Sequence, residues 1–137
     1  MIAILDASAA LEIVLGGKRS EVLAEQVERA DWVVAPHLFM AEVSNALWKY
    51  HRFHGVVLAT CEEALYRAVS LVDHFADERD LYREAFAQAC LAECPVYDMF
   101  YLVLARRNNG VLLTTDKQLA SLGDRYSVRV FSGPNCP

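Results

Sequence analysis

Four acidic residues occupy positions at which an α/β fold could carry chemistry: Asp6, Glu42, Asp98 and Asp116. Each stands at the end of a predicted strand or in the first turns of a predicted helix. Because the carboxyl ends of parallel strands meet at one edge of a sheet, we expect the four carboxylates to converge there. Four carboxylates in one pocket cannot all be ionised without a counter-charge. Oxygen-only ligands favour Mg²⁺ or Mn²⁺, and a water activated by such a metal could attack a phosphodiester.

Each acid also has a purely structural interpretation. Asp6 and Asp116 could simply be N-caps of the helices that follow them. Asp98 suits the first turn of a helix, where a negative charge interacts favourably with the helix dipole. Glu42 is harder to explain in this way, because it interrupts the apolar stretch PHLFMAEVSNAL close to the predicted buried stripe. Taken together, the structural interpretation needs four separate coincidences.

Apolar segments must position these acids. Four of the apolar segments are predicted to be strands: residues 2–5, 32–35, 111–113 and 127–131. Helices are predicted over residues 8–15, 20–27, 38–53, 60–75, 81–92 and 116–122, and over an apolar run that begins near residue 96. Ser8 and Thr60 are the predicted N-caps of the first and fourth helices, and Gly110 is predicted to end the apolar helix. Strands that alternate with helices predict an α/β fold with a mainly parallel central sheet and helices on both faces.

Length and composition place limits on the function. A chain of 137 residues predicts a single domain over 1–137, with a loosely ordered tail at 132–137. The apolar share of 55% indicates an apolar surface kept for a partner. The net charge of −5 excludes a generally basic nucleic-acid binder, although a metal-filled acidic pocket can still hold RNA phosphates. No secretion signal accompanies the four cysteines and no apolar run is long enough to span a membrane, so we expect reduced thiols and a cytoplasmic location.

Four short motifs resemble those of PIN-domain ribonucleases, and most closely those of the VapC toxins of toxin–antitoxin pairs. The motifs are D-A-S at 6–8, E-V-S-N-A-L at 42–47, Y-D-M-F-Y at 97–101 and L-T-T-D at 113–116. Each is weak alone, but their order and spacing over nearly the whole chain are specific. The resemblance implies a PIN-like three-layer sandwich and a metal-dependent endoribonuclease. It further implies a toxin that is usually a dimer and is silenced by an antitoxin whose tail fills the active-site groove.

The resemblance also implies roles for individual residues. The acidic quartet of the family falls on Asp6, Glu42, Asp98 and Asp116, and its polar supporting positions fall on Ser8, Asn45 and Thr114. Asp6 and Asp98 would ligate the metal directly, and Asp116 directly or through water. Glu42 would orient the attacking water or complete a second metal site. Some relatives have another acid just beyond the last aspartate, where this chain has Lys117 and Gln118, so the number of metals stays open.

Partners and rival functions complete the expectations. Lys49 and Arg52 continue the helix face that begins at Glu42 and could follow an RNA backbone to the pocket. Surplus apolar residues in the first four helices predict a dimer face and a groove for an antitoxin that offers an apolar helix and a basic segment. One alternative is a receiver-like phosphoacceptor signalling domain with Lys117 near its acids, although Asp6 lacks the second adjacent acid of such domains. Another is a catalytically silent PIN-like scaffold that only binds protein.

Overall fold

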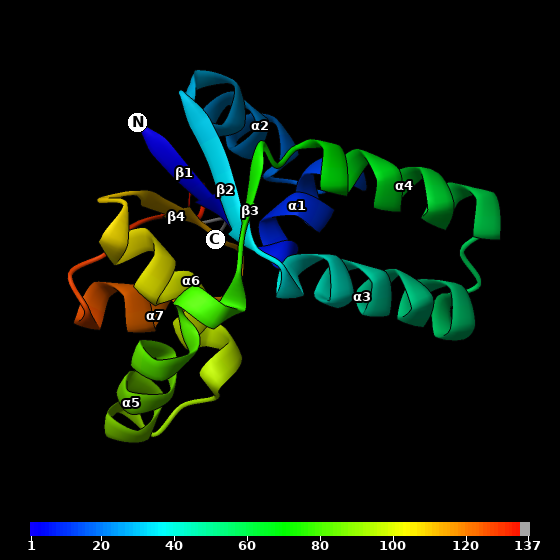
Figure 1. Cartoon of the computed structure of the whole chain (residues 1–137). Coiled ribbons are helices and arrows are strands. Elements are labelled where there is room, and N and C mark those ends of the chain that lie inside the picture. The colour runs from blue at the N-terminus through cyan, green and yellow to red at the C-terminus, as the bar shows by residue number, and fades with distance from the viewer. Residues whose placement is uncertain (135–137) are drawn as a thin grey trace.

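Five short parallel strands form the centre of the molecule in the computed structural model, which describes residues 1–134. The strands are β1 (Ile2–Leu5), β2 (Trp32–Pro36), β3 (His74–Ala76), β4 (Val111–Leu113) and β5 (Arg129–Phe131). Their order in the sheet is β3-β2-β1-β4-β5, and every neighbouring pair is parallel (Figure 1). The prediction of an α/β fold with a mainly parallel central sheet is therefore confirmed.

Helices cover both faces of this sheet (Figure 1). The first group is α1 (Ala7–Val14), α2 (Ser20–Arg29), α3 (Leu38–His54) and α4 (Leu58–Ser70). The second group is α5 (Tyr82–Ala92), α6 (Val96–Arg107) and α7 (Lys117–Arg125), preceded by a single 3₁₀ turn, η1 (Glu78–Asp80). In Figure 1, α3 and α4 run side by side and project well beyond the sheet. The three-layer sandwich is thus confirmed.

Two apolar cores lie on opposite faces of the sheet, and alternate residues of β1 divide between them. Ala3 and Leu5 belong to the core under α1 to α4, whereas Ile4 belongs to the core under α5 to α7. Leu113 and Leu112 of β4 divide in the same way. All five side chains are fully buried, as expected for central parallel strands covered on both sides.

The predicted fourth helix was wrong at both ends. It begins at Leu58, because the chain already turns at Val57, whose carbonyl accepts a hydrogen bond from Cys61 N (3.1 Å). Thr60 is therefore inside the helix and caps nothing. The helix ends at Ser70, and residues that were assigned to it form the edge strand β3, where Ala76 pairs with Pro36. β3 is an edge strand that begins with an exposed histidine, so it lacks the continuous apolar run by which the equally short β4 is recognised.

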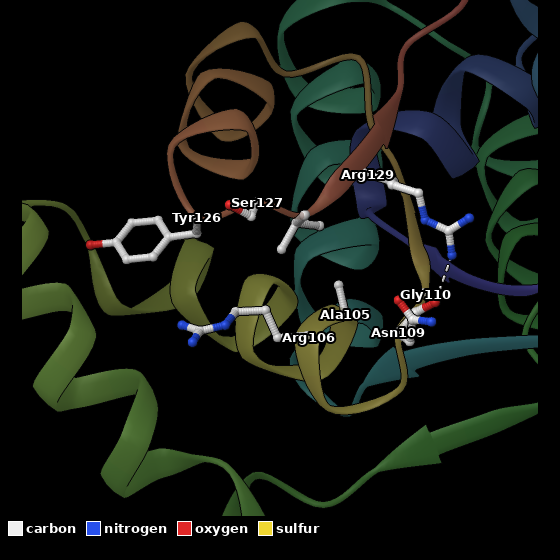
Figure 2. A pocket seen from close by; sticks show the side chains of 8 residues that line it. Ala105, Arg106, Asn109, Gly110, Tyr126, Ser127 and Arg129 are labelled. Atoms are coloured by element: carbon white, nitrogen blue, oxygen red, sulfur yellow. Dashed lines mark hydrogen bonds between the residues drawn. The ribbon is translucent and has the colours of Figure 1, made fainter.

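Two further local predictions were wrong. The first helix has Asp6, not Ser8, at its N-cap position. After α6, Asn109 adopts the left-handed conformation (φ 47°) that was expected of Gly110. Gly110 is needed for another reason, since a Cβ there would lie 3.1 Å from the backbone oxygen of Ile2. Figure 2 shows this corner, where Arg129 donates a hydrogen bond to the Asn109 carbonyl (2.8 Å) beside a cavity at the amino edge of the sheet.

The end of the chain is described as far as Pro134. Ser132, in the predicted tail 132–137, accepts a hydrogen bond at its carbonyl from Arg19 (3.0 Å), while residues 135–137 lie outside the described residues. Within residues 1–134, no helix combines the length and the apolar character that crossing a membrane requires.

Candidate active site

The candidate site lies where the strand order reverses. From β1 the chain builds outward through β2 to β3, and it later returns to place β4 and β5 on the other side of β1. Open parallel sheets bind ligands at the carboxyl edge of such a switch point. Asp6 follows β1 and Asp116 follows β4, so these two acids flank the switch point. A helix that leads into a parallel strand starts at this same edge, which brings the first turn of α6, with Asp98, to it.

Asp6 is held by two hydroxyl groups. It is one of the two buried polar side chains in residues 1–134, at 5% exposure, and the other is Thr114. Its Oδ2 accepts hydrogen bonds from Ser8 Oγ and from Thr114 Oγ1 (2.7 Å). Ser8 Oγ also accepts from Thr115 N, and Thr114 Oγ1 accepts from Asp116 N, both at 3.0 Å. Burial raises the pKa of Asp6 from its ordinary value, and the two hydroxyl bonds partly oppose that rise.

Asp116 caps a helix and still has an oxygen left for a ligand. Its Oδ1 accepts hydrogen bonds from Gln118 N (2.9 Å) and Leu119 N (3.0 Å) at the start of α7. No hydrogen bond within residues 1–134 uses its Oδ2, and the side chain is exposed. Asp6 differs, because its side chain makes no capping bond to α1. Capping therefore explains one carboxylate oxygen of Asp116, Oδ1, and it does not explain why Asp6 is buried.

Glu42 is fixed by a tyrosine from the opposite face of the sheet. Tyr101, 1% exposed in α6, donates its hydroxyl hydrogen bond to Glu42 Oε1 (2.7 Å). Burial and the nearby charges of Asp6, Asp98 and Asp116 together raise the pKa of Glu42 to about 7, against the opposing effect of the hydrogen bond from Tyr101. Tyr101 was not among the site residues predicted from the sequence. The sequence did contain a signal: Tyr101 stands in a buried apolar stripe where phenylalanine would suffice. A buried hydroxyl group needs a hydrogen-bond partner, so such a tyrosine indicates a polar contact.

Asp98 completes the group of acids. Burial, and to a smaller extent the charges of Asp116 and Asp6, raise its pKa to about 6. Asp6, Asp98 and Asp116 all contribute to the raised pKa of Glu42, in agreement with their positions at the carboxyl edge of the sheet. The ion pairs found among residues 1–134 involve none of them. The structure therefore brings the four predicted acids together without a protein cation between them.

The donor chemistry of this edge fits a hard divalent cation. The available ligands are carboxylate oxygens, which suit Mg²⁺ or Mn²⁺. Burial is the main cause of the raised pKa values of Glu42 and Asp98, and the neighbouring carboxylates contribute to them. In the described part of the chain, no group of three Asp, Glu, His or Cys side chains is arranged so that it could hold a metal ion by itself. Water and a phosphate oxygen would supply the remaining ligands, as is usual for magnesium.

Three predicted residues lie outside this network. Asn45, Lys49 and Arg52 are exposed on α3, and none of them makes a hydrogen bond or ion pair with the described residues around the acids. Arg52 lies over the ring of Phe53, 5.5 Å from its centroid. Asn45 is one helical turn beyond Glu42 and shares its face of the helix. The structure brings Ser8 and Thr114 to the acids, but it leaves these three on the surface of α3.

Comparison with known proteins identifies the family. The PIN domain family matches residues 3–124. Ribonuclease VapC3 of Pyrobaculum aerophilum is 33% identical over 122 residues, which cover 85% of this chain and 91% of that protein. Solved structures also share the fold. PAE2754 from the same organism has a TM-score of 0.71 and 23% identity, with 93% of this chain and 96% of that chain covered. VapBC2 from Rickettsia felis, bound to a DNA fragment from its promoter, has a TM-score of 0.66 and 12% identity, with 98% of this chain and 100% of that chain covered. The chain belongs to the PIN-domain family.

Proposed function

We propose that this PIN-domain protein is a metal-dependent endoribonuclease that hydrolyses RNA phosphodiester bonds as the toxin of a VapBC-type toxin–antitoxin pair. The observation that carries the proposal is the placement of Asp6 and Asp116 after the neighbouring strands β1 and β4, beside the first turn of α6 with Asp98, whose Tyr101 holds Glu42. The similarity to a protein named ribonuclease VapC3 supports it. A receiver domain is not supported, because those domains have a different strand order, 2-1-3-4-5.

Asp6, Asp98 and Asp116 would hold the cation, Mg²⁺ or Mn²⁺. Asp6 and Asp98 would bind it directly, and Asp116 would use Oδ2, directly or through water, since its Oδ1 caps α7. When bound, the cation would supply Lewis-acid contact with a phosphate oxygen and a polarised water. Ser8 and Thr114 would keep Asp6 in one rotamer through their hydroxyl bonds to Oδ2.

Glu42 would act on the attacking water or complete a second metal site. With Oε1 engaged by Tyr101, its Oε2 is the oxygen that could accept the proton of the water. A carboxyl group whose pKa lies near 7 is well matched to proton transfer at neutral pH. On α3, Lys49 and Arg52 would contact phosphates of the RNA backbone, and Asn45 would orient Glu42 or touch the substrate.

An antitoxin and a second copy of the chain are the proposed partners. The α3–α4 pair exposes large apolar side chains along its length, among them Trp48 (53%), Phe53 (63%) and Tyr66 (69%). Monomeric proteins rarely leave so many large apolar groups together in water. We further propose that residues 1–137 form one PIN-like domain, which the two cores on one sheet support. A cytoplasmic location agrees with the free thiols of Cys61, Cys90 and Cys94.

A cleavage assay tests the proposal. Single-stranded and structured RNAs would be incubated with the protein in Mg²⁺ or Mn²⁺, with and without EDTA, beside an Asp98→Asn variant. We expect cutting that needs the metal and is lost in the variant, whose fold is checked by circular dichroism. Absence of cutting on every RNA by the folded wild type would favour the protein-binding scaffold. Labelling of an aspartate by acetyl phosphate would instead favour the receiver alternative.

A further inference from the structure

A second cavity opens beside the carboxylates, between α1 and α3. Its volume is about 390 Å³, and its lining includes Ser8 and Thr115, which belong to the hydrogen-bond network around Asp6. From there the cavity extends along α1 past Leu11 to Tyr50 of α3. This volume is within the range of small-ligand sites, about 300–1,000 Å³. A group bound there would therefore be a direct neighbour of whatever the acids hold.

The walls of the cavity combine an aromatic face with aliphatic side chains. Tyr50 is 39% exposed and Leu15 is 38% exposed, so both present open surface to the cavity. Tyr50 lies near His54, with 5.8 Å between ring centroids. Its hydroxyl makes no hydrogen bond with the rest of residues 1–134. An exposed aromatic ring beside a phosphodiester site is the arrangement on which an unpaired RNA base stacks.

A fixed carboxylate supplies the polar contact. Glu12 lines the cavity, and its Oε1 accepts a hydrogen bond from Arg19 N (2.9 Å). A side chain at Gly17 would overlap this carboxylate, so the loop after α1 closes tightly around it. No hydrogen bond or ion pair of the described residues uses Oε2. Glu12 therefore offers an acceptor that is already in position and that needs an N–H donor from the ligand.

We propose that this cavity binds an unpaired guanine base of the RNA substrate next to the cleaved bond, with Tyr50 as its stacking surface and Glu12 as its hydrogen-bond acceptor. Guanine fits best because its Watson–Crick edge carries two adjacent donors, N1–H and the 2-amino group, and a carboxylate is an acceptor only. The inference rests on the proposed ribonuclease function, since only an RNA substrate would place a base beside the acids.

Binding to a protein that does not cut separates this inference from the reaction. In the Asp98→Asn background with Mg²⁺, the affinity would be measured for fluorescent single-stranded RNAs that carry one guanine, one inosine, which lacks the 2-amino group, or uridine at the same position. We expect guanine to bind about 10-fold or more tightly than inosine, as for a hydrogen bond to a charged group. Tyr50→Leu should weaken binding of the guanine RNA by about 5- to 150-fold, and Tyr50→Trp should restore most of that loss.

Two variants sharpen the test. Glu12→Gln keeps an oxygen for Arg19 N but replaces the second oxygen with a donor, so it should remove the preference for guanine over inosine. Tyr82→Leu, at a tyrosine on α5 that is 49% exposed and does not line the cavity, should leave binding unchanged. Equal effects of Tyr50→Leu and Tyr82→Leu, or a guanine preference that survives Glu12→Gln, would overturn the proposal.

The outcomes also distinguish the two proposals. If the wild type cuts RNA but the Asp98→Asn protein with an intact cavity shows no guanine preference, the base pocket alone is refuted. A protein that binds guanine but never cuts refutes the nuclease and supports the pocket. If Tyr50→Leu loses binding of an arginine-containing peptide but not of RNA, the cavity serves a protein partner and the guanine proposal is wrong.

Discussion

Replacement of Glu42 with glutamine should stabilise the metal-free protein at alkaline pH. Burial and three nearby acids raise the pKa of Glu42 from 4.5 to about 7. Below about pH 4.5 the carboxyl group is protonated in both the folded and the unfolded chain, and its burial as an ion costs nothing. Between these pH values the folded state binds a proton that the unfolded state lacks, so the free energy of unfolding falls as the pH rises. Above about pH 7 the full cost is present.

The size of the effect follows from the pKa. A tenfold change in proton affinity corresponds to about 1.4 kcal/mol, so a rise from 4.5 to about 7 sets an upper limit of about 3 kcal/mol. Since Glu42 is partly exposed, solvent screening reduces the expected gain to about 1–2 kcal/mol. The amide oxygen of glutamine can still accept the hydrogen bond from Tyr101, so the substitution removes the charge and keeps the contact.

Urea unfolding in EDTA would measure this difference at about pH 4 and about pH 8.5. Glu42→Gln should match the wild type closely at the lower pH and exceed it at the higher one. Glu63→Gln, an exposed glutamate on α4, is the control and should change neither value. Added Mg²⁺ should raise the stability of the wild type more than that of the variant. A variant that is equally destabilised at both pH values would refute this account of the acidic edge.

Three other substitutions test the site. Tyr101→Phe removes one hydrogen bond to the Glu42 carboxylate, and it should lower the free energy of unfolding by about 1–3 kcal/mol. It should also weaken the binding of Mn²⁺, measured by calorimetry. An unchanged Mn²⁺ affinity would mean that the tyrosine only packs. Thr114→Val leaves Asp6 with one hydroxyl partner and should cost about 1–3 kcal/mol in urea unfolding, whereas a neutral effect would mean that the bond is worth little. Asp116→Asn should preserve the cap of α7 and change the free energy of unfolding by less than about 0.5 kcal/mol, yet it should abolish RNA cleavage. Retained cleavage would mean that Asp116 only caps the helix.

Local patterns in the chain were sufficient for the parts of the fold that are short in sequence and strongly apolar. The runs at β1 and β4 are fully buried except at their first residues, and such runs bounded by an acid predict both a central strand and the start of a helix. The four acids could be found for the same reason, because each lies next to a segment that must be buried. The edge strand β3 was missed, since it contains no continuous apolar run and its pairing with β2 is not local.

The sequence by itself determined the α/β architecture and which acids stand at element ends, because burial and helix starts depend on neighbours a few residues away. Only the tertiary structure decided that Tyr101 of α6 reaches Glu42 of α3, and that Thr114 and Ser8, 106 residues apart, share Asp6. It also decided that Glu12 and Tyr50 border one cavity. These contacts join segments through the order of the strands, and a hydroxyl or carboxylate finds its partner only when that order brings the segments together.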